Sequence, residues 1–463
     1  MPSRIERDPL GEFPVPADAY YGVQTARALA NFPISGLTAP PLLVKATIIV
    51  KRAAAAANQR LGRLPRDIAD AVVRACDEIL AGGLANQFVV DVYQAGAGTS
   101  HNMNANEVIA NRAAEILGSA RGEYTRVHPN DHVNLGQSTN DVFPTATRLA
   151  LLMQHRLLAA ETRELAAAFE QQAGRHANVL KVGRTHLQDA VPMTLGQELG
   201  GYAACLEQSA RALDSAAEPL LELNLGATAV GTGLNAGEDF ERLAIDAIAR
   251  ATGFECRPAA NRFRVTQSMG DIVGYSGAAR RLAVELGKIA SDLRLLAMGP
   301  RAGIAEIKLP AVQPGSSIMP GKVNPSVPEM VNQVCFQVIG CDATVAVAGE
   351  AGQLELNVMM PVIAWNALHA AAILTTAQHA LRERTVVGLE ADAARAQELL
   401  GRSTAVATAL SPYLGYAVTA DVAKSAVSSG RTIRDIVLER GLMPAEKLDK
   451  VLSVEAMTRP GVA

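Results

Sequence analysis

The chain has 463 residues, with 43 Lys and Arg against 46 Asp and Glu, so its formal net charge is −3. Hydrophobic residues make up 49% of the chain and aromatic residues only 4%. This composition excludes intrinsic disorder, and the absence of a basic block argues against a nucleic acid or an anionic membrane as partner. The length predicts roughly two to four domains.

The cysteines and the N-terminus bear on the compartment. The five cysteines are scattered and form no CxxC pair, which is typical of free thiols in a reducing cytoplasm. The first residues, MPSRIERDPLG, carry charges where a signal peptide needs an apolar core. We find no apolar run that approaches the roughly 18 residues of a membrane span. The sequence therefore predicts a soluble, cytoplasmic protein.

The first 40 residues are rich in Pro and Gly and predict extended chain with turns. A helix is expected over residues 42–61. The Gly- and Asn-rich stretch 94–106 is too polar and too small to form core by itself.

From about Asp141 the apolar residues recur every three or four positions, the spacing of long helices buried against other helices. The first such helix carries Val142, Ala146, Leu149, Met153 and Leu157. The second carries Leu195, Leu199, Tyr202, Leu206 and Leu213. The clearest carries Ile272, Tyr275, Ala279, Leu282, Leu286, Ile289, Leu293 and Leu296. Further apolar helices are expected over 327–348 and 362–381. This pattern predicts a long helical bundle that associates with copies of itself.

The predicted fold is mainly α and has three domains. We expect an N-terminal mixed or helical domain over residues 1–140, a central long-helix domain over 141–393 and a small C-terminal helical domain over 394–463. Residues 411–415, SPYLG, break the chain within the last of these.

Four polar segments lie between the apolar helices, at residues 98–102, 136–141, 183–189 and 314–325. Any one of them could be a helix cap, as the run Ser138–Asn140 before the long helix illustrates. The fourth differs, because glycines and prolines frame two serines, a lysine and an asparagine. Residues 315–322 do not match a phosphate-binding loop, since the glycines are wrongly spaced. Hydroxyls, amides and Lys322 suit a carboxylate ligand, and a loop serine could act as a base if a cation and N–H groups stabilised its alkoxide.

The segment GSSIMPGKVNP at 315–325 strongly resembles the signature of the aspartase/fumarase superfamily. The segments GTSHNMNANE, QSTND, GRTHLQDAVPMTLGQE and LGATAVGTGLN match the superfamily in order and spacing, over essentially the whole chain. Thr139 in QSTND, where fumarases usually have Ser, makes the chain look more like an aspartase than a class II fumarase.

This resemblance implies a homotetramer around a helical core, with each active site built from three subunits. It also implies a C–N lyase that eliminates ammonia from the small amino acid L-aspartate to give fumarate. No cofactor would be required for the chemistry, although Mg²⁺ activates some relatives at a separate site. By resemblance, Ser316 is the catalytic base, acting through an aci-carboxylate intermediate. The residues that match substrate-binding positions of the family are Thr99, Ser138, Thr139, Asn140, Thr185, His186, Ser317, Lys322 and Asn324.

Two positions depart from the aspartase pattern. Met360 stands where aspartases usually have Glu, and His101 stands where a smaller or apolar residue is expected. Both can be specificity residues or packing variation. Three alternatives to an aspartase therefore stay open: a class II fumarase, a sister lyase with another leaving group such as an ergothionase-like enzyme, and a catalytically silent structural homologue.

Overall fold

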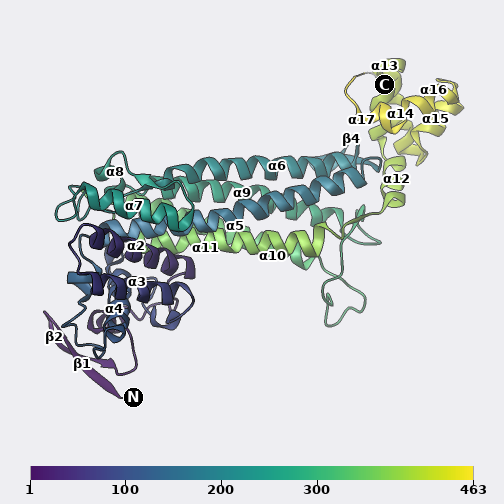
Figure 1. The fold of residues 1–463 in the computed structure, drawn as a ribbon. Helices are drawn as coiled ribbons and strands as arrows, with labels where there is room; N and C mark the ends of the chain where they lie inside the picture. Colours follow the sequence, from purple (N-terminus) through teal and green to yellow (C-terminus); the bar gives the residue numbers. More distant parts are fainter. Residues whose placement is uncertain (1, 462–463) are drawn as a thin grey trace. The chain divides into compact units, whose positions relative to one another are not determined.

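The computed structural model describes residues 2–461 and is mainly α-helical, with four two-stranded sheets among the described residues (Figure 1). The chain divides into two compact units. The first unit comprises Met1–Ala159, Arg211–Arg281 and Gln337–Leu374, and the second comprises Ala160–Ala210, Leu282–Phe336 and Thr375–Ala463. The boundaries fall inside the five longest helices, α5 (Thr139–Arg175), α6 (Leu195–Ala217), α9 (Gly270–Leu296), α10 (Ser326–Glu350) and α11 (Met360–Leu381).

The first unit begins with an antiparallel hairpin of β1 (Ser3–Asp8) and β2 (Gly11–Pro16), drawn in purple in Figure 1. A helix, α1 (Val23–Asn31), follows it. The expectation of extended chain over the first 40 residues is therefore wrong for these nine residues. A helix here buries one face: the buried residues are Val23, Thr25, Ala26 and Ala28, and Val23 and Ala26 are three positions apart, as on one side of a helix.

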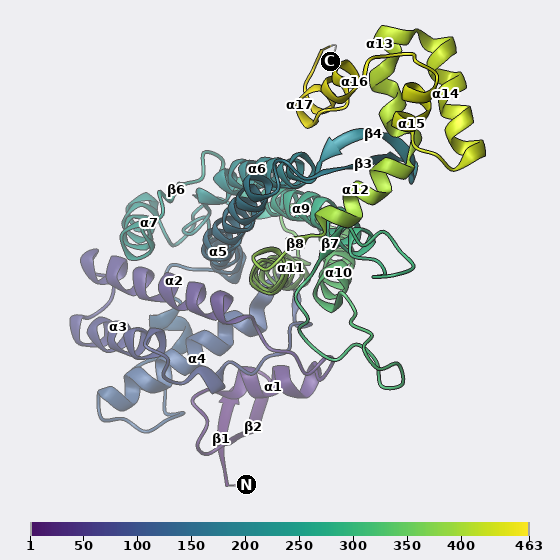
Figure 2. The same cartoon turned by 90° about the vertical axis from the view of Figure 1, so that its right-hand side faces the viewer.

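The core of the first unit lies among α2 (Pro41–Arg60), α3 (Arg66–Leu80) and α4 (Thr99–Ile116), which lie side by side (Figure 2). The expected helix over 42–61 is thus confirmed. Residues 94–106 were expected not to form core by themselves; in the structure the first turns of α4 are buried within the fold of the first unit. Some of their polar side chains are satisfied internally, since Asn104 bonds to the backbone of Gln87 and Val89. The side-chain oxygens of Asn102 and Asn106 are buried without a hydrogen-bond partner among the described residues.

The long helices bury most of the predicted apolar positions. All eight of those predicted in α9 and all five in α6 are buried. In α5 the predicted stripe holds at Val142, Ala146 and Leu149, but Leu157 is 54% exposed while Leu158 is buried. The prediction for Leu157 is wrong because a straight helix drifts by about 20° per heptad relative to a strict seven-residue repeat.

The second unit contains a hairpin of β3 (Leu180–Thr185) and β4 (Gln188–Thr194) and a group of short helices near the C-terminus (yellow in Figure 1). These helices are α12 (Ala393–Arg402), α13 (Ser411–Leu414), α14 (Tyr416–Ser429), α15 (Ile433–Glu439), α16 (Ala445–Val451) and α17 (Val454–Thr458). The predicted break at 411–415 appears as the single turn of α13, which ends at Gly415 with φ +75°.

The remaining elements are short. They are η1 (Ala85–Gln87), η2 (Gly96–Gly98), η3 (Pro129–Val133), η4 (Glu218–Leu221), β5 (Glu222–Leu223), α7 (Glu238–Thr252), β6 (Arg257–Pro258), α8 (Arg262–Gln267), β7 (Ile307–Lys308), η5 (Arg382–Val386), β8 (Glu390–Ala391) and η6 (Thr404–Leu410).

The predicted three-domain boundaries stay a prediction. One cluster of buried residues runs from Ile48 to Val133 and another from Ala407 to Val451, inside the predicted first and third domains. Compactness divides the chain into two units instead, because the long helices contribute to both.

Two further sequence expectations can be compared with the structure. All five cysteines are free, as predicted, and three of them are buried. By contrast, α10 and the segment from α11 through η5 are long and apolar enough to pass a test for membrane-spanning helices. The statement that no apolar stretch approaches that length is therefore corrected. Core helices pass the same test, and 61% of the apolar window in the second segment is buried.

Candidate functional site

Two helices of the first unit begin next to each other. Helix α4 starts at Thr99, whose side chain is exposed, and α5 starts at Thr139, which is partly buried. Their first turns are joined by a hydrogen bond from Asn102 Nδ2 to Thr139 Oγ1, 3.0 Å long. The first N–H groups of a helix have no partner within it and carry partial positive charge. Two such ends side by side, each with a threonine hydroxyl, suit a carboxylate.

The approach of these two helices depends on Gly98. This residue has φ +85°, and a Cβ built on it would lie 2.1 Å from the Phe143 ring of α5. The same segment is tied to the residues before α11, because Ala97 N–H donates to Val358 C=O over 2.9 Å. Glycine is therefore required for Thr99 to reach its position at the start of α4.

The QSTND segment is fixed by Asp141, which is fully buried. Its carboxylate accepts backbone N–H bonds from Ser138 at 3.0 Å and from Gly226 and Thr228 at 3.1 and 2.9 Å. Burial raises the pKa of Asp141 to about 7. Asn140 Nδ2 donates to Ala229 C=O at 2.8 Å. These bonds hold the start of α5 against the LGATAV segment.

Ser138 also acts as the cap that its position predicts. Its hydroxyl accepts the N–H of Asn140 at 3.2 Å, while Asp141 accepts the N–H of Ser138. A capping role and a ligand role are compatible here, because the Ser138 hydroxyl keeps its proton available for donation.

His101 lies in the core of the first unit. Its Nε2 lies 2.9 Å from Thr47 Oγ1, and its ring packs edge-on against Phe143 with 5.7 Å between centroids. Since the Thr47 hydroxyl donates to Leu43 C=O, Nε2 must carry the proton. Burial, with the nearby Lys51, lowers the pKa of His101 to about 4. This placement favours packing over a specificity role for His101.

Met360 is the first residue of α11 and is only 2% exposed. Its neighbours Val358 and Met359 are about 40% exposed, at 39% and 41%. The Met360 side chain thus points into the core of the first unit, which also favours packing over specificity.

In the second unit Thr185 and His186 lie at the tip of the β3–β4 hairpin, and both are exposed. Thr185 pairs with Gln188, so His186 and Leu187 form the two-residue turn, with φ +55° and +59°. Such turns normally use Asn or Gly, and a larger residue there stores strain. Strain of this kind is frequent at functional sites.

A buried ionic cluster anchors the base of the hairpin. Glu306, only 1% exposed, accepts two bonds from Arg184, at 2.9 and 3.0 Å, and lies 3.3 Å from Lys181 Nζ. Arg184 belongs to the GRTHLQD segment, so one part of that motif supports the tip and another part is exposed on it.

The signature loop of the second unit closes on itself. A Cβ at Gly315 would lie 2.2 Å from Lys322 C=O, and Asn324 Nδ2 donates to Gly315 C=O at 2.8 Å. Ser316 Oγ accepts the backbone N–H groups of Ile318 and Met319, at 3.3 and 3.0 Å. Ser317 and Lys322 are exposed.

A cavity of about 830 Å³ opens beside this loop. Lys322 and Asn324 line it, together with the basic residues Arg294, Lys308 and Arg395. The acidic residues Glu329 and Asp392 line it too, and Lys308 pairs with Asp392 while Arg395 pairs with Glu398. Among the described residues, Lys322 and Arg294 are the lining cations left for an anionic ligand.

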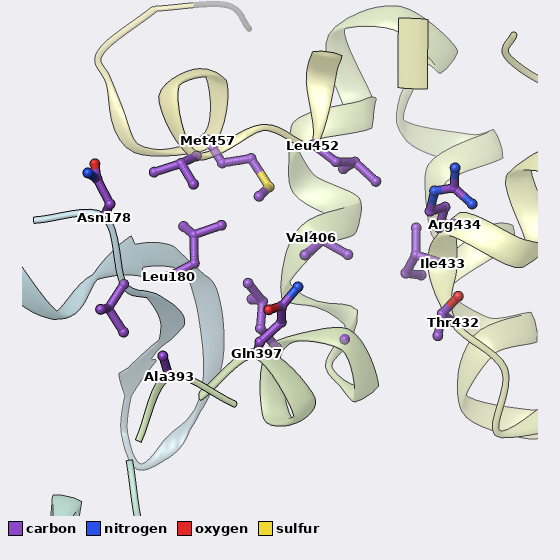
Figure 3. A pocket seen from close by; sticks show the side chains of 14 residues that line it. Asn178, Leu180, Ala393, Gln397, Val406, Thr432, Ile433, Arg434, Leu452 and Met457 are labelled. Carbon is purple, nitrogen blue, oxygen red and sulfur yellow. The ribbon is translucent and has the colours of Figure 1, made fainter. Parts of the chain in front are cut away.

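A second cavity, of about 430 Å³, lies in the second unit between the β3 strand and the C-terminal helices (Figure 3). Leu180, Val406 and Met457 line it, together with the polar side chains of Gln397 and Arg434. The predicted site residues are not among those that line it.

Sequence reasoning missed the polar residues that support the start of α5. Lys51 is fully buried, and its Nζ donates to Asn134 Oδ1 and Gln137 Oε1, both at 2.9 Å. Burial lowers the pKa of Lys51 to about 7. The available signal was a lysine inside the apolar run IIVKRAAAA, because a lysine in a buried helix face requires polar partners.

The structure therefore groups the predicted site residues in two sets. Thr99, Ser138, Thr139 and Asn140 come together in the first unit, around the two helix starts. The second unit carries the others, on the hairpin tip and the signature loop: Thr185, His186, Ser316, Ser317, Lys322 and Asn324. Among residues 2–461 no group of three His, Cys, Asp or Glu side chains is placed to hold a metal ion.

Comparisons with known proteins match nearly the entire chain. A family model described as lyase matches residues 11–340, and one described as fumarase C C-terminus matches residues 406–459. The aspartate ammonia-lyase of Pseudomonas aeruginosa is 50% identical, over 99% of this chain and 97% of that protein. The aspartate ammonia-lyase of Escherichia coli strain K12 is 48% identical, over 99% and 96%.

Solved structures are similar to the same extent. A fumarate lyase:delta crystallin of Brucella melitensis has a TM-score of 0.96 at 50% identity, covering 99% of this chain and 100% of that one. A class II fumarase of Schistosoma mansoni has a TM-score of 0.95 at 37% identity, with the same coverage.

Proposed function

The chain belongs to the aspartase/fumarase superfamily of lyases, and we propose that it is the aspartate-specific member, which eliminates ammonia from L-aspartate to give fumarate. The observation that carries this proposal is the full-length identity of about 50% to proteins named aspartate ammonia-lyase, against 37% to a class II fumarase. The predicted fold is confirmed at the level of the superfamily.

The base in this reaction is Ser316. It removes a proton from Cβ of aspartate, and the electrons of the C–H bond move into the β-carboxylate to give an aci-carboxylate dianion. The C–N bond then breaks, so that those electrons form the double bond of fumarate and nitrogen leaves as ammonia. A serine alkoxide needs hydrogen-bond donors, and the N–H groups of Ile318 and Met319 supply two.

The dianion requires donors that strengthen as its charge develops. Thr99, Ser138 and Thr139 at the two helix starts hold the β-carboxylate, together with Ser317 of the signature loop. Lys322 and Asn324 hold the α-carboxylate, and the exposed position of Lys322 on the cavity wall supports this assignment. The amino group lies near Thr185, His186 and Asn140. These roles rest on the family resemblance and on the environments described above.

The functional assembly is a homotetramer in which three subunits contribute to each active site. Apolar side chains exposed on α10 support self-association, since Phe336 is 67%, Ile339 39% and Val347 69% exposed. Burying them between subunits would also account for the apolar character of α10 without a membrane. Because this explanation of α10 needs no membrane, we propose that the protein is cytoplasmic. The chemistry requires no cofactor, and Mg²⁺ activation stays a prediction.

The proposal is tested by following fumarate in the ultraviolet with the purified protein, separately on L-aspartate and on L-malate. Fumarate from aspartate with little from malate is the expected result. Activity on malate alone would assign the chain to the fumarases, and silence on both would assign it to a lyase with another leaving group or to a structural homologue. Light scattering on the same sample checks the tetramer, which a monomeric or dimeric active species would contradict.

A further inference from the structure

A continuous chain of side chains leads from the buried Lys51 to Thr139 at the start of α5. Lys51 Nζ donates to Asn134 Oδ1 at 2.9 Å. The same oxygen accepts from Asn102 Nδ2 at 3.3 Å, and Asn102 Nδ2 also donates to Thr139 Oγ1 at 3.0 Å. The chain lies entirely in the first unit and joins α2, the loop before α5, and α4.

The direction of every bond in this chain follows from its first member. A protonated lysine amine has three N–H bonds and no lone pair, so it donates to Asn134 and Gln137 and accepts from neither. Asn134 must therefore turn its oxygen toward Lys51. Because that oxygen only accepts, the group of Asn102 that faces it must be the NH₂ group. Asn106 Nδ2, 3.1 Å from the same oxygen, reinforces this orientation.

The orientation of Asn102 determines which hydrogen bonds the Thr139 hydroxyl can make. Asn102 NH₂ has two N–H bonds, one for Asn134 and one for Thr139, so Thr139 Oγ1 must accept from Asn102. Its own proton is then directed elsewhere, and among residues 2–461 it has no acceptor. A carboxylate can only accept hydrogen bonds, so a hydroxyl restricted to donation is what a carboxylate site needs.

We propose that Lys51, Asn134 and Asn102 are positioning residues that fix the Thr139 hydroxyl as a hydrogen-bond donor to the substrate carboxylate. This inference rests on the proposed function, because it takes Thr139 to contact the β-carboxylate. The chain is costly to build, since Lys51 and Asn102 are buried and Asn134 is partly buried, and an apolar core would be simpler to pack. Fixing the polarity of one hydroxyl before the charge develops accounts for that cost.

The test is a double-mutant cycle between Asn102→Asp and Thr139→Val, measured as kcat/KM for L-aspartate. Aspartate at 102 has the shape of asparagine but cannot donate, so it draws the Thr139 proton inward. Asn102→Asp alone should lower kcat/KM by about 10- to 100-fold, less than the loss of an oxyanion donor itself can cost. In the Thr139→Val background the same change should have less than about a twofold effect. Losses that multiply would overturn the proposal.

The matched control is Asn111→Asp, the same substitution on the same helix. Asn111 is also fully buried, and its amide donates to Tyr20 C=O at 2.8 Å and to Tyr124 Oη at 3.1 Å, away from Thr139. This variant should lose stability but keep kcat/KM within about twofold, provided that assay temperature is below its melting point. A loss equal to that of Asn102→Asp would reduce Asn102 to a structural role and overturn the proposal.

A binding measurement separates this proposal from the proposed function. Succinate is a dicarboxylate without a leaving group, so its Kd measured by calorimetry does not depend on turnover. Weaker succinate binding in Asn102→Asp, abolished in the Thr139→Val background, supports the positioning role even if aspartate is not the substrate. Unchanged succinate binding, together with additive kinetics on an active enzyme, rejects it while leaving the lyase function in place.

Discussion

Ser316 Oγ accepts the backbone N–H of Met319 at 3.0 Å, inside the loop that Gly315 allows to close. This bond, with the one from Ile318, makes the hydroxyl oxygen an acceptor in the ground state and stabilises negative charge on it. The geometry is also that of an ordinary serine turn, so only activity distinguishes a catalytic serine from a structural one.

Replacing Ser316 by Ala should therefore abolish most turnover while leaving the fold intact. We expect kcat to fall by about 10²- to 10⁴-fold, the usual contribution of a general base. The measurement is the ultraviolet assay for fumarate, with circular dichroism and light scattering to check folding and assembly. Ser428→Ala, at an exposed position of α14, is the control and should be fully active. A Ser316→Ala enzyme with near-normal kcat would remove Ser316 from the mechanism.

We expect the ionic cluster around Glu306 to stabilise the β3–β4 hairpin. Glu306→Leu leaves Arg184 without its carboxylate partner, while Lys181 keeps Glu198 at 3.0 Å. Removing one partner of a buried ion pair costs about 3–5 kcal/mol, and we expect a loss near the lower end of that range. We expect a lower melting temperature and a higher KM, because the tip that carries Thr185 and His186 loses its anchor. Glu170→Gln, on an exposed face of α5, is the control. An unchanged melting temperature would show that the cluster is not needed to hold the hairpin.

Gly98 and Gly118 form a matched pair, since both have positive φ, +85° and +82°. A Cβ at Gly118 meets no atom within 4 Å, whereas one at Gly98 meets the Phe143 ring at 2.1 Å. Gly118→Ala should cost only the backbone strain of about 1–2 kcal/mol. Gly98→Ala should cost more and should also lower kcat/KM, because Thr99 is displaced. Equal melting temperatures and equal activities for the two variants would contradict this account.

Because His101 is buried, we expect the stability of the folded protein to be sensitive to acid. Its folded pKa of about 4 lies below the ordinary value of 6.5, so between these limits the unfolded chain binds more protons than the folded one. The free energy of unfolding should therefore fall as the pH drops from about 6.5 to 4, by on the order of 3 kcal/mol for this residue. Lys51 is the charged group that faces the ring, and it remains protonated in this range.

The comparison is between the wild type and His101→Leu, using the urea midpoint at pH 4.5 and at pH 7. The variant lacks the Thr47 bond and should be less stable at pH 7, but its loss on acidification should be smaller. Parallel pH profiles for the two proteins would place the acid-sensitive group elsewhere.

The periodicity of α9 was sufficient to predict both its helix and its buried face, because a helix of 27 residues averages over local exceptions. The short helix α1 was not predicted, because the surrounding sequence is rich in Pro and Gly and the helix is stabilised by tertiary burial. Composition could not reveal that residues 94–106 are buried against other segments, because it does not show which polar side chains find partners; Asn104 finds them in residues 87 and 89.

Some features of the candidate site could likewise be predicted from the sequence, and others depend on the tertiary structure. Local sequence alone determined the loop of Ser316, the capped start of α5 and the chemistry of a carboxylate ligand, because these depend on residue types within a few positions. Whether His101 and Met360 face a ligand or the core depended on tertiary packing, which buries both. The role of Lys51 likewise emerged only from the fold. Asn134 and Gln137 of the loop before α5 satisfy its amine, and Asn102 of α4 links Asn134 to Thr139. No local pattern records that these segments meet.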